Sequence, residues 1–280
     1  MKRTWDVTRA AAWLGWQVEA NWANPILFLS YSFAKPLATT LILFFMVKVV
    51  SHGQANRDTF LFLFIGNTFF LYVSEVLIGL SWAIFRDRED FETLKYVYLA
   101  PIRMVPYLAG RALTKVGTAT IGVGAALLFG KFLLKLPITG SLETFAALAG
   151  VVVLGLGGIG FLGLALAGAA LVMARHSMNL NEGLTGAFYL LCGAVFPIEV
   201  LPSWARQISL ALPFTYWLEL IRRLLTGRSY AAPLRGMGDG SLILILALST
   251  VILGAASILW FRWCEHTARA RGLIDWKTNY

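Results

Sequence analysis

Residues 155–160 (Gly-Leu-Gly-Gly-Ile-Gly) have the spacing of a dinucleotide-binding loop, in which glycines let the backbone approach a pyrophosphate. That chemistry needs a strand before the loop and an acidic residue about twenty positions after it. Here the glycines lie within an uninterrupted apolar run, and Arg175 and His176 stand where the acid should be. Close packing of helices on small residues explains the glycines better, so we do not expect a nucleotide there.

Residues 124–131 resemble a phosphate-binding loop only loosely. The spacing is one residue too long, and Phe132 replaces the Ser or Thr that would bind Mg²⁺. The sequence also contains no H-E-x-x-H, no G-x-S-x-G and no cluster of Cys and His. We therefore expect no ATPase or other catalytic site in this chain, and no cofactor or metal bound by it.

Two charged residues interrupt apolar runs: Lys35, within residues 25–50, and Glu75, within residues 59–85. Counted along helices from one side of a membrane, both lie about 14 Å deep at 1.5 Å per residue. A charge in lipid costs at least about 2.5–3.5 kcal/mol, so such groups normally pair or face a cavity. We expect an intramembrane ion pair. The alternatives are a role in substrate binding or gating, and snorkelling of Lys35 toward the interface.

Residues 86–95 form a charged island between apolar runs. Seven of these ten residues are charged, in a chain that is 14% charged overall. The island cannot lie in lipid, and its flanks cannot lie in water. Phe91, Leu94 and Tyr98 recur at helical spacing and would give a short helix one apolar face. This pattern predicts an ordered element over residues 86–100 that docks on another protein.

The composition predicts the class of fold that positions these residues. The chain is 58% hydrophobic, whereas its 14% charged residues compare with about 25% in a soluble domain. Its apolar runs are continuous and do not alternate, which favours helices over a β-barrel. The predicted class is an all-α integral membrane protein. The net charge of +9 arises from basic residues near span ends, where anionic lipids explain them without nucleic acid.

We expect a single transmembrane domain over residues 1–280. Residues 1–24 should form an amphipathic helix on the membrane surface, since its tryptophans favour the interface. Pro25 suits the first turn of the next helix. Six transmembrane helices are expected, at residues 25–50, 59–85, 116–134, 145–173, 184–196 and 241–261.

Residues 197–225, between the last two expected spans, are too polar to cross lipid and too apolar for a free loop. Irregular or broken helix at membrane depth is tolerated where it packs on protein or lines a cavity. We expect a re-entrant helical hairpin on the outer side. The excess of Lys and Arg places both termini and residues 86–100 in the cytoplasm, and the protein in the inner or plasma membrane as a multi-pass protein.

Three features together resemble a known family, the ABC-2-type permeases, which are membrane subunits of ATP-driven exporters. The first is the order of an interfacial helix, six spans and a charged loop between spans 2 and 3. The second is Glu92-Thr93-Leu94 followed by Ala100-Pro101. The third is residues 193–202, with two prolines and an acid, followed by Pro213-Phe214-Thr215-Tyr216, Glu219 and Arg222. The resemblance covers nearly the whole chain.

The resemblance implies that the charged loop is a coupling helix docked on a separate nucleotide-binding subunit, which holds ATP and Mg²⁺. The residues that would contact this subunit are Asp87, Arg88, Glu89, Asp90, Phe91, Glu92, Thr93, Leu94 and Tyr98. It also implies a second permease chain, the same or similar. The outer helices would act as a gate, at Phe196, Pro197, Glu199, Pro202, Pro213, Glu219 and Arg222.

The function that we expect is export of a hydrophobic or amphipathic cargo, such as a drug, a lipid or a lipid-linked glycan, by alternating access. The alternative is a secondary transporter driven by an ion gradient. Such carriers usually place several ionisable groups near the membrane centre. Spans 3 to 6 contain no acid in their cores, which favours the exporter.

Overall fold

The computed structural model describes residues 2–20, 24–50, 57–137, 141–173 and 177–274. Within these ranges the chain is helical and forms no strand, as the continuous apolar runs predict. The long helices are α2 (Pro25–Val50), α3 (Arg57–Glu89), α5 (Met104–Phe132), α6 (Leu142–Val172) and α10 (Asp239–Ala270). The remaining helices are α1 (Lys2–Ala20), α4 (Leu94–Leu99), α7 (Ser177–Leu191), η1 (Ile198–Val200), α8 (Ser203–Ala211), α9 (Pro213–Thr226) and η2 (Ala232–Leu234).

The five long helices are the ones that, in the described part of the chain, have the length and hydropathy to cross a membrane. The expected fifth span, residues 184–196, is not confirmed. The helix at this position, α7, has 15 residues, so its length is about 22 Å at 1.5 Å per residue, short of a hydrocarbon core of about 30 Å. It ends before Gly193, whose φ of 71° breaks the helix.

Three helices extend beyond the expected spans, each because polar residues find partners in the bundle. α5 begins at Met104, twelve residues before the expected start of its span at residue 116. α3 continues to Glu89, and α10 continues to Ala270. Arg111, which precedes the expected start of the α5 span, is buried along α5.

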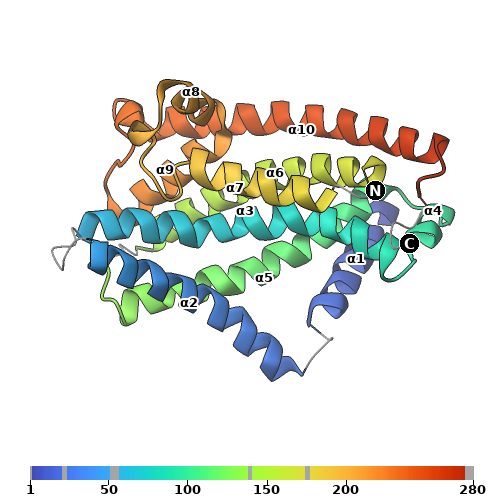
Figure 1. The fold of residues 1–280 in the computed structure, drawn as a ribbon, viewed down its shortest axis with the longest axis horizontal. Coiled ribbons are helices and arrows are strands. Elements are labelled where there is room, and N and C mark those ends of the chain that lie inside the picture. The colour runs from blue at the N-terminus through green and yellow to red at the C-terminus, as the bar shows by residue number, and fades with distance from the viewer. Residues whose placement is uncertain (1, 21–23, 51–56, 138–140, 174–176, 275–280) are drawn as a thin grey trace.

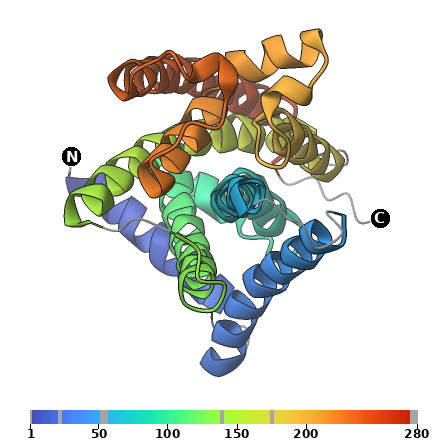
Figure 2. The same ribbon diagram turned by 90° about the vertical axis from the view of Figure 1, so that its left-hand side faces the viewer.

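The helices are arranged around α3, which runs the length of the molecule (Figure 1). In the end-on view, α6 and α10 lie on one side of α3, and α2 and α5 lie on the other (Figure 2). The start of α1 and the last turns of α10 lie at the same end as α4, called here the α4 end. The opposite end, with α8, is called the α8 end.

The apolar core has two parts that follow one another along α3. The larger part, toward the α8 end, includes Phe64, Phe69 and Trp217. The smaller part, at the α4 end, includes Ile84 and Leu94, and it joins α1, α3, α4, α5, α6 and α10. The small helix α4 is therefore built into the core of the α4 end.

α1 lies against the first half of α5. Thr114 Oγ1 on α5 donates to the carbonyl oxygen of Ala12 at 2.8 Å, and Thr8 Oγ1 donates to that of Pro106 at 3.2 Å. Trp5 and Trp13, which predicted a membrane-surface helix, are both 65% exposed. That placement on the membrane stays a prediction, and residues 1 and 21–23 of the expected helix lie outside the described residues.

The expected hairpin over residues 197–225 is formed by η1, α8 and α9. α9 packs between α3, α6 and α10, and its Trp217 and Ile221 are fully buried. The indole Nε1 of Trp217 donates to the carbonyl oxygen of Val151 on α6 at 2.9 Å. A Cβ on Gly155 would lie 2.2 Å from this nitrogen, so the first glycine of the apparent dinucleotide motif makes room for a tryptophan.

Candidate functional site

The structure divides the charged island into a buried part and an exposed part. Asp87, Arg88 and Glu89 form the last turn of α3 and are 2%, 3% and 8% exposed. A turn then leads into α4, and within it Glu92 adopts a left-handed φ of 52°. Few non-glycine residues adopt this conformation, so the turn geometry is set by the packing on both sides of it.

Asp87 connects the end of α3 to α5. Its Oδ2 accepts a hydrogen bond from the phenol of Tyr107 at 2.6 Å, and its Oδ1 lies 3.8 Å from Nη2 of Arg111. A carboxylate this deeply buried is tolerated because it has a hydrogen-bond donor and a cation beside it.

Arg88 connects the same turn to α6. Its Nε lies 3.1 Å from Oε1 of Glu89, and its Nη1 donates to the carbonyl oxygen of Ala170 at 3.1 Å. Ala170 is in the last turn of α6, where a cation is favourable to the helix dipole. The polar end of α3 is thus bound to the helices on both of its sides.

α4 is fixed by the residues that predicted its apolar face. Leu94 is 1% exposed and belongs to the core of the α4 end. Tyr98 lies under the guanidinium of Arg269 on α10, 4.8 Å from its ring centroid, and Arg269 pairs with Glu265 at 2.7 Å. Burial raises the pKa of Tyr98, and the nearby Glu265 carboxylate acts in the same direction, so the phenol stays neutral.

The residues predicted to contact a partner differ in their exposure. Asp87, Arg88, Glu89 and Leu94 face their own chain, which leaves them little surface for a partner. The exposed apolar side chains of this region lie elsewhere, at Phe91 (45%), Tyr96 (62%) and Leu99 (81%). Phe91 precedes α4 and is not on its helical stripe. The charged side chains of Asp90, Glu92 and Lys95 lie around these three residues and are also partly exposed.

A polar cavity of about 340 Å³ lies between α1, α3 and α5, and a second of about 340 Å³ adjoins it beside α2. Both are lined by Glu19, Lys35 and Glu75. Nζ of Lys35 lies 3.3 Å from Oε1 of Glu75, and the two side chains are 55% and 29% exposed. The two intramembrane charges therefore pair, and they face a cavity as well.

The cavities continue along α3 toward the α8 end. A third space of about 90 Å³ shares Lys35 and Ser74 with the others, and it reaches Asn67. The three cavities together extend from Arg86 to Asn67, nineteen residues along α3. That distance is about 28 Å at 1.5 Å per residue, close to the thickness of a hydrocarbon core. The polar lining of the third space is supplied mostly by hydroxyl groups, at Thr39, Thr40, Thr68 and Ser74.

We expect Glu75→Ala to destabilise the protein more than the double change Lys35→Ala with Glu75→Ala. The single variant leaves the lysine charge without its partner, whereas the double variant removes both charges. Interactions between membrane helices average about 0.6 kcal/mol and reach about 1.7 kcal/mol, so a coupling energy of about 1 kcal/mol is expected. Thermal unfolding of the four proteins of this cycle in detergent measures it, and additive effects would contradict the pairing.

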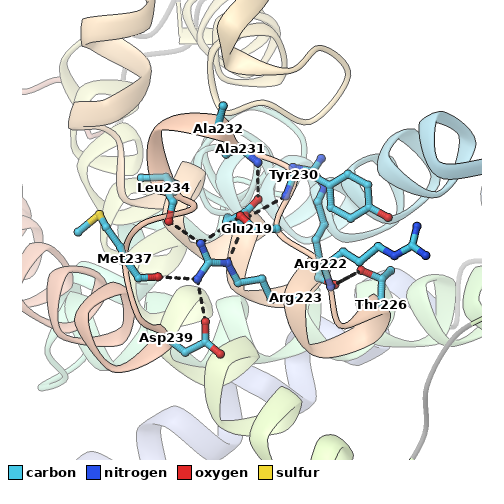
Figure 3. A network of polar contacts seen from close by, with 12 residues as sticks. Glu219, Arg222, Arg223, Thr226, Tyr230, Ala231, Ala232, Leu234, Met237 and Asp239 are labelled. Atoms are coloured by element: carbon cyan, nitrogen blue, oxygen red, sulfur yellow. Dashed lines mark hydrogen bonds and ion pairs between the residues drawn. The ribbon is translucent and has the colours of Figure 1, made fainter.

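At the α8 end, the side chain of Glu219 in α9 is the centre of a buried polar network (Figure 3). Glu219 is 1% exposed. Its Oε1 accepts from Ser229 Oγ at 2.6 Å and from the Tyr230 amide at 3.1 Å, and its Oε2 accepts from the Ala231 amide at 3.1 Å. The carboxylate thus folds the segment after α9 back onto the helix.

Arg223, which the sequence analysis did not single out, is the second centre of this network (Figure 3). Its Nε lies 3.1 Å from Oε1 of Glu219, and its Nη1 lies 2.9 Å from Oδ1 of Asp239 at the start of α10. It also donates to the carbonyl oxygens of Leu234 and Met237. Its spacing of four residues from Glu219 on an amphipathic helix was the signal that could have identified it.

Arg222 points the other way and is 3% exposed. Its Nη2 donates to the carbonyl oxygen of Gly193 at 2.7 Å and to that of Ala194 at 3.3 Å, and its guanidinium lies 3.8 Å from the ring centroid of Phe62. The arginine therefore binds the carbonyl groups that the end of α7 leaves free. Glu219 and Arg222, both predicted gate residues, are interior parts of the fold.

The other predicted gate residues lie nearer the surface. Phe196 is 46% exposed, and Glu199 Oε1 accepts a hydrogen bond from the Ala232 amide. Pro197 and Pro202 immediately precede η1 and α8, and Pro213 is the first residue of α9. The exposed apolar side chains of α8 are Trp204 (65%) and Ile208 (44%). A gating role for this region stays a prediction.

Among the described residues, no group of three or more His, Cys, Asp or Glu side chains could hold a metal ion. Comparison with known families gives one match: the family model described as "ABC-2 type transporter" matches residues 14–226. The match includes α4, the cavities and the part of the α8-end network that lies on α9, with Glu219, Arg222 and Arg223. A search of curated proteins found no match to the chain.

Proposed function

Because the chain belongs to the ABC-2 type transporter family, it is a permease subunit of an ABC transporter, and we propose that it exports a hydrophobic or amphipathic cargo. A permease of this family is a transmembrane component and not itself the ATPase. The family implies a nucleotide-binding ATPase partner and usually a second permease. The protein is accordingly a multi-pass membrane protein.

The proposal is supported by the two surfaces of the α4 region, of which the outer is exposed and the inner is buried in the core. Its outer surface presents Phe91, Tyr96 and Leu99 with a rim of charged side chains. An exposed aromatic and aliphatic centre inside a charged rim is the usual composition of a protein interface. Its inner surface is part of the core that joins α3, α5, α6 and α10. A partner seated on the outside would therefore move several spanning helices at once.

The proposed partner is the ATPase subunit, which would hold ATP and Mg²⁺. Closure of two such subunits would displace α4, and Leu94, Tyr98 and the Asp87 contacts would pass the displacement to the bundle. Because packed interfaces tend to be bistable, a displacement of this kind can switch the bundle between two arrangements. The α4 end and both termini would then be cytoplasmic.

The cavities along α3 are the proposed route for cargo within one permease chain. They extend over about the thickness of a hydrocarbon core and are lined by hydroxyl and charged groups on one side. α8 and the residues around Pro197 would form the outer gate. The α8-end network would hold this gate in place, because Arg223 links α9 to the start of α10.

The test is to purify the tagged chain from its native cell in mild detergent and to identify what accompanies it by mass spectrometry. We expect an ATPase subunit of domain size, in stoichiometric amount. Trapping with ATP in a hydrolysis-blocking state should increase its yield, since closure strengthens the contact. Absence of an ATPase under both conditions would contradict the exporter and favour a carrier driven by an ion gradient, with Lys35 and Glu75 as its ionisable groups.

A further inference from the structure

The side chains that line the two larger cavities include more cations than carboxylates. Four cationic side chains line them, at Lys35, Arg86, Arg111 and Lys115, against two carboxylates, at Glu19 and Glu75. Asp87 and Asp90, outside the lining, lie 3.8 Å from Arg111 and 3.9 Å from Arg86. These cations come from three helices, α2, α3 and α5. Their gathering around one space is therefore a product of the fold and not of a charged stretch of sequence.

The carboxylates leave some of the N–H donors of these cations without an acceptor. Nζ of Lys115 lies 2.9 Å from Oε2 of Glu19, and Nη1 of Arg86 lies 3.7 Å from its Oε1. Arg111 has Asp87 at 3.8 Å, but its Nη1 is buried without a hydrogen-bond partner among the described residues. That nitrogen is closed to the cavity, so the donors available to an anionic oxygen are those of Lys35, Arg86 and Lys115, whose side chains are 55%, 29% and 17% exposed.

The rest of the lining is apolar on one side. Phe28, Tyr31 and Leu71 line the second cavity, and Ile78 and Trp82 line the first. Each space is in the range of ligand pockets, which start at about 300 Å³. One wall thus suits an anion and the other suits a hydrocarbon chain. The ligand with both properties is an amphipath.

We propose that these cavities bind a phosphate-bearing head group of an anionic amphipath, whose chain lies along the Phe28, Tyr31 and Leu71 wall. Arginine and lysine bind phosphate oxygens through charge-assisted hydrogen bonds, which are about twice as strong as neutral ones. Arg86 and Lys115 supply these bonds, and Lys35 lies at the apolar side of the space. The inference rests on the proposed function only in identifying this amphipath as cargo.

The test titrates the full-length chain, purified with any bound ATPase, with short-chain phosphatidylglycerol and with phosphatidylcholine of equal chain length. Native mass spectrometry reports the bound lipid. We expect saturable binding of phosphatidylglycerol and at least about tenfold weaker binding of phosphatidylcholine, because the choline cation of the latter is repelled by the lining cations, and tenfold corresponds to about 1.4 kcal/mol. Equal binding of the two lipids would overturn the proposal.

Lys115→Gln should weaken phosphatidylglycerol binding about tenfold, and Lys115→Arg should restore it, because charge and donors return. Lys131→Gln is the matched control: it removes the same charge from the other end of the same helix, where the side chain is exposed. Lys35→Gln is a second variant, should Lys115→Gln not fold. Unchanged binding in both cavity variants, with folding verified by circular dichroism, would overturn the proposal.

Inorganic phosphate distinguishes the source of the anion. If it displaces phosphatidylglycerol only at far higher concentration than the lipid itself, the amphipath is the ligand. If phosphate binds as tightly as the lipid, the amphipathic part of the proposal is overturned and the site takes a soluble phosphorylated compound. ATPase co-purification is scored on the same samples. If the ATPase co-purifies but the chain shows no lipid selectivity, this inference alone is overturned. If the ATPase is absent but lipid binding is selective, only the exporter assignment is overturned.

Discussion

Leu99→Asp is expected to weaken association with the ATPase subunit strongly while the bundle stays folded. Leu99 is 81% exposed in the free chain, at the end of α4. A charge placed there costs the free permease little, but it would be desolvated against the partner. Central interface residues cost at least about 2 kcal/mol when lost, which corresponds to roughly thirtyfold weaker binding. Tyr96→Asp, at a side chain that is 62% exposed, should act in the same way.

Leu142→Asp is the matched control. Leu142 is 87% exposed and starts α6, so the chemical change and the exposure are similar to those at Leu99. An acid in the first turn of a helix is also compatible with its dipole. The control should retain the ATPase in co-purification and keep cargo-stimulated ATP turnover. If Leu99→Asp and Tyr96→Asp behave like Leu142→Asp, the partner does not dock on α4.

Leu94→Asp, in contrast, is unsuitable for testing docking, although Leu94 was predicted to lie in the partner contact. It is 1% exposed in the core of the α4 end, so an aspartate there would be a buried, unpaired charge. Periodicity predicts that Phe91, Leu94 and Tyr98 share one face, but α4 begins at Leu94 and leaves Phe91 outside it. Periodicity could not show whether that face meets a partner or the rest of the chain, because both bury apolar side chains equally well.

Continuous apolar runs were sufficient to predict the helical class and four spans with nearly correct starts. They failed at the termini next to the charged island, where the expected spans exclude Asp87 and Arg111. These two residues lie inside α3 and α5, since each supplies a partner for the other. The fifth expected span is not confirmed. Residues 192–196 are apolar, but the left-handed turn at Gly193 ends the helix.

The pairing of Lys35 with Glu75 could be predicted from helical rise alone, because the two charges are equally distant from the expected ends of adjacent helices. The cavity around this ion pair could not be predicted. Its lining joins Glu19 of α1 to Lys115 of α5, and that pairing depends on α1 lying along α5. No spacing within one helix indicates which surface helix packs on it.

The α8-end network could not be predicted from the sequence either, since its donors come from a segment with no recognisable motif. Residues 227–238 have no long helix, yet Ser229, Tyr230 and Ala231 all donate to Glu219. Glu219 and Arg222 were predicted at an outer gate, and Arg223 was not singled out. The direction in which each side chain leaves α9 decides that Arg223, and not Arg222, pairs with Glu219.

Glu219→Ala is expected to destabilise the protein by about 3–5 kcal/mol, because it breaks a buried charged network and leaves Arg223 without one of its two acidic partners. The Tyr230 and Ala231 amides would also lose their acceptor. Glu219→Gln should cost less, since its amide oxygen can still accept. Thermal unfolding in detergent, followed by circular dichroism, measures both.

Glu143→Ala is the control for this change, because Glu143 is an exposed acid in the first turn of α6. Its loss should cost less than about 1 kcal/mol, the upper range for an exposed charge at a helix start. If Glu219→Ala unfolds at the same temperature as Glu143→Ala, the network does not stabilise the α8 end. If Glu219→Ala is destabilised as expected yet the ATPase still co-purifies, the two ends of the bundle serve separable roles. That result would follow from the division of the core into two parts along α3, in which only the part at the α4 end contacts α4.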